Sequence, residues 1–247
     1  LYENEIENIR NKLLSLDLFK SVTVSKELID DNLMDINISV EEKQTGTFNA
    51  GVSVGTLDGF SILGGLKERN FYGTGRSLEV LLNTSETRRT LKFETKNRFS
   101  YIDDSTISYN INFNESDLSQ SASYKLNSFQ TGIGLGYKIN NELFHNINLD
   151  YAIKEYIVTD SSTVSSSIAD TAGESVSFLL KNNFRYSSLN TGFIPKYGNY
   201  LNYNNTIETP TSSNNGFIRN IITYKKYNNF DKNILSLQGK IGNIFSL

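Results

Sequence analysis

The chain has 247 residues, a net charge of −3 and 38% hydrophobic residues, which suits one large domain or two small ones and gives no indication of nucleic-acid binding. Cys and Trp are absent and His occurs once, so the usual ligands and nucleophiles of zinc, iron–sulfur and thiol chemistry are missing. No window approaches the ~20 continuous apolar residues of a membrane-spanning helix, but a spanning strand needs only ~10 residues with every second one apolar.

The first 43 residues differ in pattern from the rest. Apolar residues near helical spacing predict an amphipathic helix over residues 3–16, and two alternating runs at 19–24 and 33–40 predict a hairpin. A helix with a hairpin is half of a small α+β unit and too small to be stable alone. Because the chain also starts at Leu1 without an initiator Met, we expect it to be an internal piece of a longer protein.

From Gly46 onward, apolar and polar residues alternate almost everywhere, which predicts strands with two different faces. The clearest runs lie at residues 48–54, 78–82, 107–113, 129–139, 147–157 and 176–186. About eleven such strands predict a mainly β fold, an antiparallel up-and-down transmembrane β-barrel that is only partial and follows the small α+β unit. Lys92, Glu94 and Lys96 share a face that should point into a polar lumen.

The lengths of the predicted connections support a barrel, because membrane barrels alternate short turns on one side with longer loops on the other. Long, polar outward connections lie at residues 114–124, 159–174 and 209–216. Short inward connections lie at residues 70–75, 139–142 and 228–232. The exceptions are tight outward connections at 56–59 and 85–87 and a long inward one at 187–199.

Three motifs occur in the order found in a known family, the BamA family of bacterial outer-membrane protein assembly factors. The end of its last POTRA domain and the start of its barrel are similar to Leu18-Phe19, Asp35-Ile36, Val40-Glu41-Glu42-Lys43 and Gly46-Thr47-Phe48. Its turn between the second and third barrel strands resembles Asn70-Phe71-Tyr72-Gly73-Thr74-Gly75. Its Leu-Asp-x-Gly-x-x-Pro-x-x-Gly turn resembles Leu189-Asn190-Thr191-Gly192-Phe193-Ile194-Pro195-Lys196-Tyr197-Gly198, with Asn190 in place of the usual Asp.

The resemblance implies a division of the chain. Residues 1–43 would be the C-terminal part of a POTRA domain, and residues 44–247 the N-terminal portion of a transmembrane barrel that has sixteen strands in the family. The remaining strands would follow Leu247. An open barrel leaves backbone groups unpaired in lipid, at a cost of several kcal/mol each, so we do not expect the isolated 247-residue chain to be a stable membrane protein.

The resemblance also implies a function, the assembly and insertion of β-barrel proteins into the bacterial outer membrane, with the N-terminal segment in the periplasm. The implied partners are unfolded outer-membrane β-barrel clients, accessory lipoproteins and outer-membrane lipid, with no nucleic acid. No cofactor, metal or enzymatic step is implied, and we expect the chain not to be an enzyme.

The working part implied by the resemblance is the first barrel strand, which would pair weakly with the last one and template client strands at this lateral seam. This strand consists of Gly46, Thr47, Phe48, Asn49, Ala50, Gly51, Val52, Ser53, Val54 and Gly55. Its glycines either weaken the pairing or relieve crowding inside the barrel, and the sequence leaves both readings open.

The two turn motifs are interpreted mainly as architecture on the periplasmic side. Their candidate residues are Asn70, Phe71, Tyr72, Gly73, Gly75, Pro195 and Gly198. Glycine permits positive φ in such turns, and the aromatic pair suits a membrane boundary. Asp103-Asp104 is attributed to turn chemistry rather than to catalysis or metal binding, and His145 is assigned no role.

Several alternatives remain. Within the superfamily, the alternatives are a TamA-like assembly protein, which would also carry POTRA units and a sixteen-strand barrel, and a two-partner-secretion transporter. A passive outer-membrane channel would not need the N-terminal helix and hairpin. An outer-membrane enzyme would need a nucleophile with a base, and a single His makes a His-based set improbable.

Overall fold

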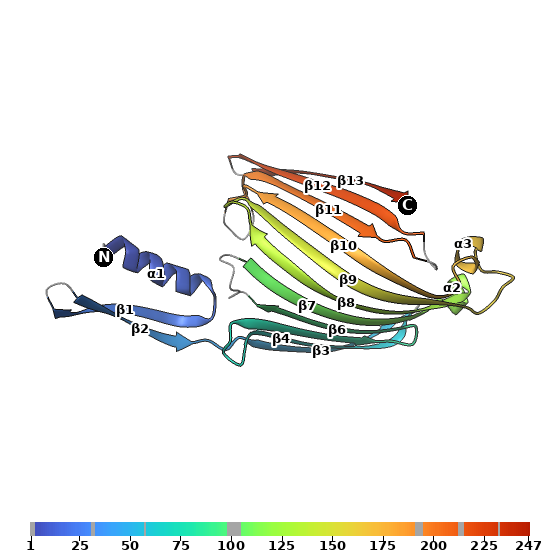
Figure 1. Ribbon diagram of the computed structural model, residues 1–247, viewed down its shortest axis with the longest axis horizontal. Helices are drawn as coiled ribbons and strands as arrows, with labels where there is room; N and C mark the ends of the chain where they lie inside the picture. Colours follow the sequence, from blue (N-terminus) through green and yellow to red (C-terminus); the bar gives the residue numbers. More distant parts are fainter. Residues whose placement is uncertain are drawn as a thin grey trace.

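The computed structural model describes residues 3–30, 33–56, 58–97, 105–190, 195–211, 215–231 and 233–247, in two parts (Figure 1). In the first, helix α1 (Glu3–Ser15) packs on strand β1 (Phe19–Asp30), which pairs antiparallel with β2 (Leu33–Glu42). Leu18 and Val22 are buried between the helix and the hairpin. The predicted helix and hairpin are therefore present, with strands longer than the alternating runs.

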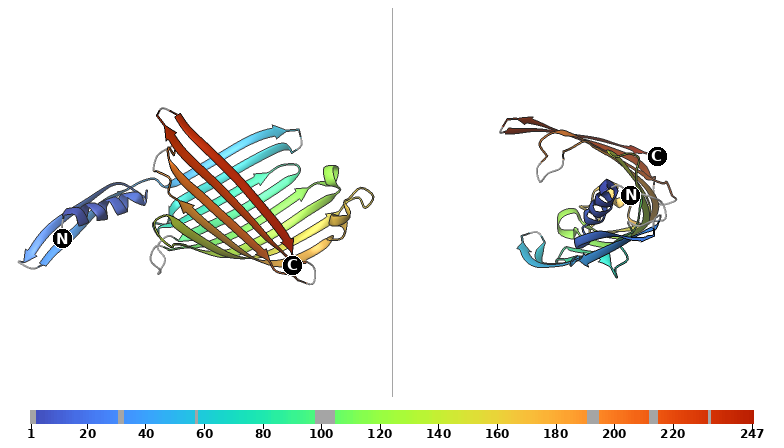
Figure 2. Two further views of the ribbon diagram at one scale, coloured as in Figure 1. Left: turned by 90° about the horizontal axis from the view of Figure 1, so that it is seen from above. Right: turned by 90° about the vertical axis from the view of Figure 1, so that its left-hand side faces the viewer.

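The second part is one antiparallel sheet of 11 strands in sequential order, which confirms the predicted fold class. Its strands are β3 (Gly46–Gly55), β4 (Gly59–Phe71), β5 (Arg76–Thr84), β6 (Arg88–Asn97), β7 (Ser105–Asp117), β8 (Tyr124–Lys138), β9 (Leu143–Val158), β10 (Gly173–Ser187), β11 (Gly198–Glu208), β12 (Phe217–Phe230) and β13 (Asn233–Ser246). Strands β3 and β13 form the two edges, and Figure 2 shows the sheet rolled into a trough that does not close.

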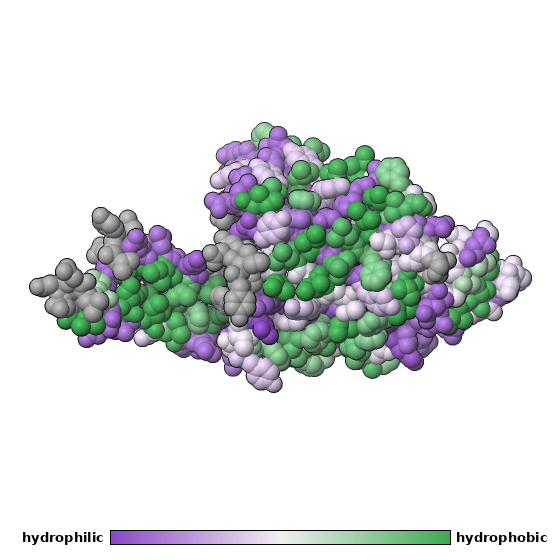
Figure 3. All heavy atoms as spheres, viewed as in Figure 1, coloured by the Kyte–Doolittle hydropathy of each residue, from purple (hydrophilic) through white to green (hydrophobic). Residues whose placement is uncertain are grey.

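The two faces of the sheet differ in polarity because side chains alternate along each strand. One face carries large apolar residues such as Phe113, Ile133 and Leu149, each about half exposed. The opposite face carries polar residues, and Asp150 and Ser177 on it are buried. Figure 3 shows the apolar face as bands of hydrophobic residues across the strands, with hydrophilic residues running between them. We call these the outer and inner faces.

Ion pairs gather on the inner face. Lys92 contacts Glu94 at 2.9 Å, and Lys96 contacts the same carboxylate at 2.6 Å, so the three charged residues expected in the lumen share this face. Further along the sheet, Lys181 pairs with Asp150 at 2.9 Å. Charges that are paired in this way can be held in a partly enclosed space, which suits a polar lumen.

The connections alternate between the two ends of the sheet. The loops at 118–123 and 159–172 carry short helices α2 (Ser119–Ala122) and α3 (Ser166–Ala169), and they lie at the end away from α1 (Figure 1). The predicted short and long connections lie at the strand ends, but β7 continues to Asp117 and β12 to Phe230, so the connections predicted at 114–124 and 228–232 are shorter than expected. No helix in the described part of the chain is long and apolar enough to cross a membrane.

Residues 43–45 join β2 to β3. The assignment of residues 1–43 to a POTRA domain stays a prediction, as does the domain boundary at 43 and 44. Asp103-Asp104 lies outside the described residues.

Candidate functional site

Strand β3 is an edge strand with one paired side. Its residues pair with β4 from Gly46 opposite Glu68 to Gly55 opposite Gly59, and no other described strand lies against it. All ten of its residues are exposed. An edge of this kind presents a row of backbone donors and acceptors to any strand that approaches it.

The outer face of β3 is apolar and uncovered. Phe48, Val52 and Val54 are 73%, 72% and 81% exposed. Thr47, Asn49 and Ser53 lie on the other face, as the two-residue period requires. A strand that added to this edge could therefore bury apolar side chains on one face and keep polar ones on the other.

The glycines of β3 do not all fill crowded positions. A Cβ atom built at Gly51 would meet no described atom within 4 Å, and one at Gly55 would meet only a backbone nitrogen at 4.0 Å. At Gly46 the nearest atom, at 2.9 Å, belongs to the Glu68 carboxylate. Crowding by the described residues therefore does not explain Gly51.

The start of β3 is tied to the end of β4 by one carboxylate. Glu68 accepts hydrogen bonds from the hydroxyl of Thr45 and from the backbone N–H of Asn70, the latter at 2.8 Å. This contact links the connection before β3 to the turn after β4. The seam strand and the turn motif, predicted separately, are thus brought together at one end of the first hairpin.

The turn at 70–75 has the backbone conformation that its glycines predicted. Gly73 and Gly75 have φ of 69° and 71°, and Tyr72 also lies in the left-handed region. The side-chain oxygen of Asn70 accepts the N–H of Gly75 at 2.7 Å and closes the turn. The ring of Phe71 lies 4.4 Å from that of Tyr72, and Tyr72 is 88% exposed.

A second contact connects the N-terminal unit with the same hairpin. Asp17, between α1 and β1, accepts a hydrogen bond from Lys43 at 2.5 Å and another from Arg69 on β4. The hydrogen bond from Lys43, with the positive charges of Lys43 and Arg69, lowers the pKa of the Asp17 carboxyl below its ordinary value. We call this three-residue contact the Asp17 clamp. Sequence reasoning missed it because the partners are 52 residues apart.

The second turn motif lies between β10 and β11, far from β3 in the sheet order. Asn190 accepts the backbone N–H groups of Lys196 and Tyr197 at 2.8 and 3.0 Å. The amide oxygen of Asn190 thus accepts the hydrogen bonds that an Asp carboxylate would accept at this position. Gly198 has φ of 115°, and a Cβ there would collide with the backbone of residues 188 and 189. Pro195 is within this turn, while Thr191–Ile194 lies outside the described residues.

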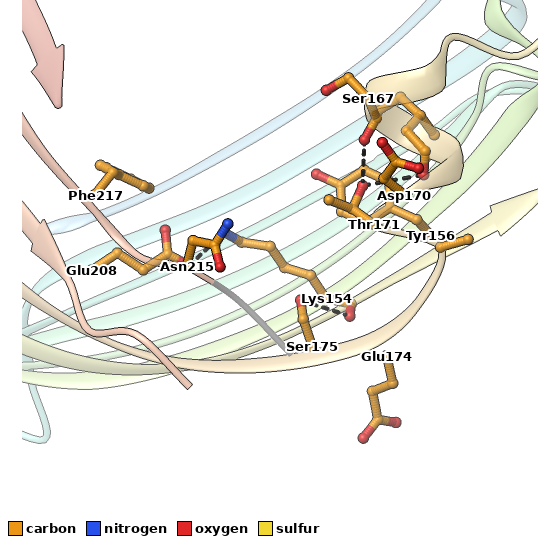
Figure 4. Close-up of a pocket in the computed structure, with 12 residues that line it drawn as sticks. Lys154, Tyr156, Ser167, Asp170, Thr171, Glu174, Ser175, Glu208, Asn215 and Phe217 are labelled. Carbon is orange, nitrogen blue, oxygen red and sulfur yellow. Dashed lines mark hydrogen bonds and ion pairs between the residues drawn. The ribbon is translucent and has the colours of Figure 1, made fainter. Parts of the chain in front are cut away.

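A hollow of 710 Å³ lies on the inner face, under the loop that carries α3 (Figure 4). Lys154 on β9 reaches across it to Glu208 on β11 at 3.2 Å, and Glu208 is only 1% exposed. The hydroxyl of Thr171 accounts for two hydrogen bonds within the loop. The loop therefore covers part of the inner face.

Comparison with known proteins gives the family. Residues 70–246 match the Omp85 superfamily domain.

The chain belongs to the Omp85 superfamily.

Among curated relatives, it is 24% identical over 214 residues to the outer membrane protein assembly factor BamA of Neorickettsia risticii, a match that covers 83% of this chain and 28% of that protein. The predicted resemblance to the BamA family is therefore confirmed. The chain spans about a quarter of the length of that curated relative.

Solved structures show the same fold. BamA from Haemophilus ducreyi lacking POTRA domains 1–3 matches with a TM-score of 0.77 and 19% identity, over 98% of this chain and 49% of that one. CdiB from Escherichia coli matches with a TM-score of 0.58 and 11% identity, over 98% of this chain and 49% of that one. CdiB from Acinetobacter baumannii matches with a TM-score of 0.52 and 13% identity, over 96% of this chain and 47% of that one.

Proposed function

We propose that this Omp85 chain assembles β-barrel proteins into the bacterial outer membrane, and that the edge of β3 is where client strands are templated. The observation that carries the proposal is the place of β3 as the first strand of the sheet, paired on one side among the described residues, with an exposed apolar row and a glycine at position 51 that no described neighbour crowds. The match to BamA of Neorickettsia risticii supports the assignment, since that protein is an outer membrane protein assembly factor.

The mechanism is β-augmentation. A client strand pairs with the free backbone groups of β3, and because main-chain hydrogen bonds are the same for every sequence, one edge serves many clients. Burial of the client's apolar face and satisfaction of its backbone in lipid drive the reaction. No cofactor, nucleotide or enzymatic step is needed.

The membrane environment follows from the two faces of the sheet. The outer face contacts outer-membrane lipid, and the inner face lines a polar lumen. The end that carries α1 and the Asp17 clamp lies on the periplasmic side, where unfolded clients and accessory lipoproteins reach it. The long loops with α2 and α3 lie on the opposite side.

Site-directed crosslinking tests the seam in the full-length protein, and the absence of native Cys in this chain helps. Single Cys residues at Phe48, Asn49, Ala50 and Gly51 should crosslink to a stalled client in an alternating pattern, because alternate side chains of a strand point to opposite faces.

Two control regions make this test specific. Ile107–Phe113 lies on β7 in the middle of the sheet and should give no client crosslinks. Ile241 and Gly242 lie on β13, at the other end of the strand order, and should also give none if β3 alone templates clients. Equal crosslinking from either region would show that β3 is not the seam.

A transporter or TamA-like protein of the same superfamily is the second candidate. The likeness to the two CdiB chains favours it, at lower TM-scores than the BamA chain. Failure of the β3 variants to capture barrel clients, together with intact passage of a secreted substrate, would select this candidate. A passive channel is the more distant one, since it would need neither an open edge nor the N-terminal unit.

A further inference from the structure

Four asparagines interrupt the apolar outer face in one straight row. Asn182, Asn205, Asn220 and Asn243 lie on β10, β11, β12 and β13, and each is directly opposite the next in the strand register. They share the face that carries Phe178, whereas Lys181 and Asp150 lie on the inner face. We call this set the Asn row.

Each asparagine of the row has apolar or aromatic neighbours on the same face of its own strand, two residues away on either side. These neighbours are Leu180 and Phe184, Tyr203 and Ile207, Ile218 and Ile222, and Ile241 and Phe245. The row is therefore embedded in the apolar surface rather than at its polar rim. Toward β8 the same row continues as Ile147 and Leu135, which are hydrophobic.

The amides of the row are joined to one another. Asn182 donates to Asn205 at 3.4 Å, Asn205 to Asn220 at 2.8 Å, and Asn220 to Asn243 at 3.0 Å. The hydroxyl of Tyr203 also donates to the Asn220 oxygen, at 2.8 Å. The row is thus a chain of cross-strand hydrogen bonds that spans four strands.

His145 continues the chain on β9. Its Nε2 lies 3.3 Å from the Asn182 oxygen, and its Nδ1 lies 2.9 Å from the hydroxyl of Tyr137 on β8. Its ring stacks on Phe184 with centroids 4.0 Å apart and is only 8% exposed. The single His is thereby held in place as the first member of the polar chain.

A polar side chain on a lipid-facing surface is costly unless it is hydrogen-bonded, since hydrocarbon supplies no partner. Each amide in the row meets this need only if the neighbouring strand is in the correct register. A shift of one strand by one residue would turn its asparagine to the inner face and leave the amides of the neighbouring strands without their partner. The row therefore distinguishes the correct register more strongly than an all-apolar face, whose contacts are not directional.

The row reaches β13, the last strand in the order of the described sheet. Asn243 on this strand accepts the hydrogen bond from Asn220. Each of the four strands thus contributes one amide to the chain of hydrogen bonds.

We propose that the Asn row is a register-setting device, in which the hydrogen bonds between the amides hold β10, β11, β12 and β13 against one-residue shifts. The row does not involve β3, the proposed seam, which lies at the other end of the strand order.

Coupling between the amides is the first test, in the full-length protein in outer-membrane lipid. Asn220→Leu removes the acceptor of the Asn205 amide and of the Tyr203 hydroxyl and the donor to Asn243, so the folded-to-unfolded ratio in urea should fall roughly five-fold or more. Ile222→Leu, on the same strand and face, should leave it nearly unchanged. Replacement of all four asparagines by Leu should lose less than the four single changes combined, because no amide is then left unsatisfied.

If the losses of stability simply add, or if Asn220→Leu and Ile222→Leu lower stability equally, the amides are not coupled. If Asn220→Leu fails to fold, the variant with all four replaced still decides the question, since the proposal requires it to be the more stable of the two. A less stable fourfold variant would contradict the proposal.

The register itself is the second test, read by disulfide formation between Cys residues placed at Ile222 and Ile241, which lie directly opposite each other on β12 and β13. Replacement of all four asparagines by Leu should lower the yield of this disulfide. An unchanged yield would overturn the register-setting role.

Discussion

At the residue scale, the turn between β10 and β11 shows how one substitution keeps a structural role. Asn190 stands where the resembling family has Asp, and its oxygen still accepts two backbone N–H groups. The acceptor oxygen, rather than the negative charge, is therefore what the turn needs. The charge would add strength, because hydrogen bonds to a carboxylate are stronger than those to an amide.

We expect Asn190→Asp to keep or slightly raise stability, and Asn190→Leu to lower it by about 1–2 kcal/mol, because two N–H groups then lose their acceptor. Urea unfolding of the membrane-inserted protein measures both. Ser167→Val, a change in the loop that carries α3, controls for a general effect of removing a polar side chain, because the Ser167 hydroxyl makes no hydrogen bond within the described residues. Equal stability of the Leu variant would show that water replaces the lost acceptor.

At the element scale, β3 differs from the strands in the middle of the sheet. Most strands pair on both sides, which holds each one in place, whereas β3 and β13 each pair on one side only among the described residues. Glycine lowers the strength of such a strand further, since it contributes no side-chain contact and loses more backbone entropy. Gly51 is thus the residue at which the proposed seam can be strengthened without a clash.

Gly51→Val tests this reading, because the added atoms meet open space and β-branched residues favour strands. We expect the folded protein to be at least as stable, and client insertion into liposomes to slow by about five-fold, the ratio that ~1 kcal/mol of extra strand stability gives. Gly239→Val is the matched control, since Gly239 lies on the other edge and also has open space around it. Equal slowing by both changes would contradict a special role for β3.

At the scale of the whole molecule, the Asp17 clamp joins the two parts of the chain. Asp17 comes from the N-terminal unit, Lys43 from the connection, and Arg69 from the first hairpin of the sheet. The proposed seam starts next to this contact, at Gly46. The contact that orients the N-terminal unit therefore lies next to the residues with which the pairing of β3 begins.

We expect Asp17→Asn to loosen the N-terminal unit from the sheet and to increase proteolysis within residues 43–45. The physical reason is the loss of the negative charge that holds two cations from different segments. Glu41→Gln is the matched control, because it removes the ion pair with Lys20, which lies wholly within the N-terminal unit. Similar proteolysis of both variants would show that the clamp does not restrain the connection.

The clamp should also respond to acid. The pKa of Asp17 is lowered in the folded protein, so its contribution is fully present above the ordinary carboxyl value of 3.8 and is lost as the pH falls through the lowered pKa. Proteolysis at 43–45 with an acid-tolerant protease should therefore rise in the wild type below about pH 3.8. The Asp17→Asn variant should not show this rise, and a rise of the same size in both would assign it to other groups.

Much of the fold was readable from the sequence because its signals are local. A two-residue period fixes which residues share a face, so Phe48, Lys92 and Phe113 could be placed on the apolar or polar side before the sheet was known. The turn at 70–75 was equally readable, since Gly73 and Gly75 are the residues that tolerate its positive φ.

Contacts between distant segments were decided only by the tertiary structure. Arg69 reaches Asp17, and Asn220 reaches Asn205 and Asn243, through strand register and sheet order. A single sequence records the period of each strand but not its alignment with its neighbours, because many alignments bury the same apolar residues. The sequence by itself thus determined the barrel-like sheet and its two faces, whereas register decided the Asp17 clamp, the Asn row and the open space at Gly51.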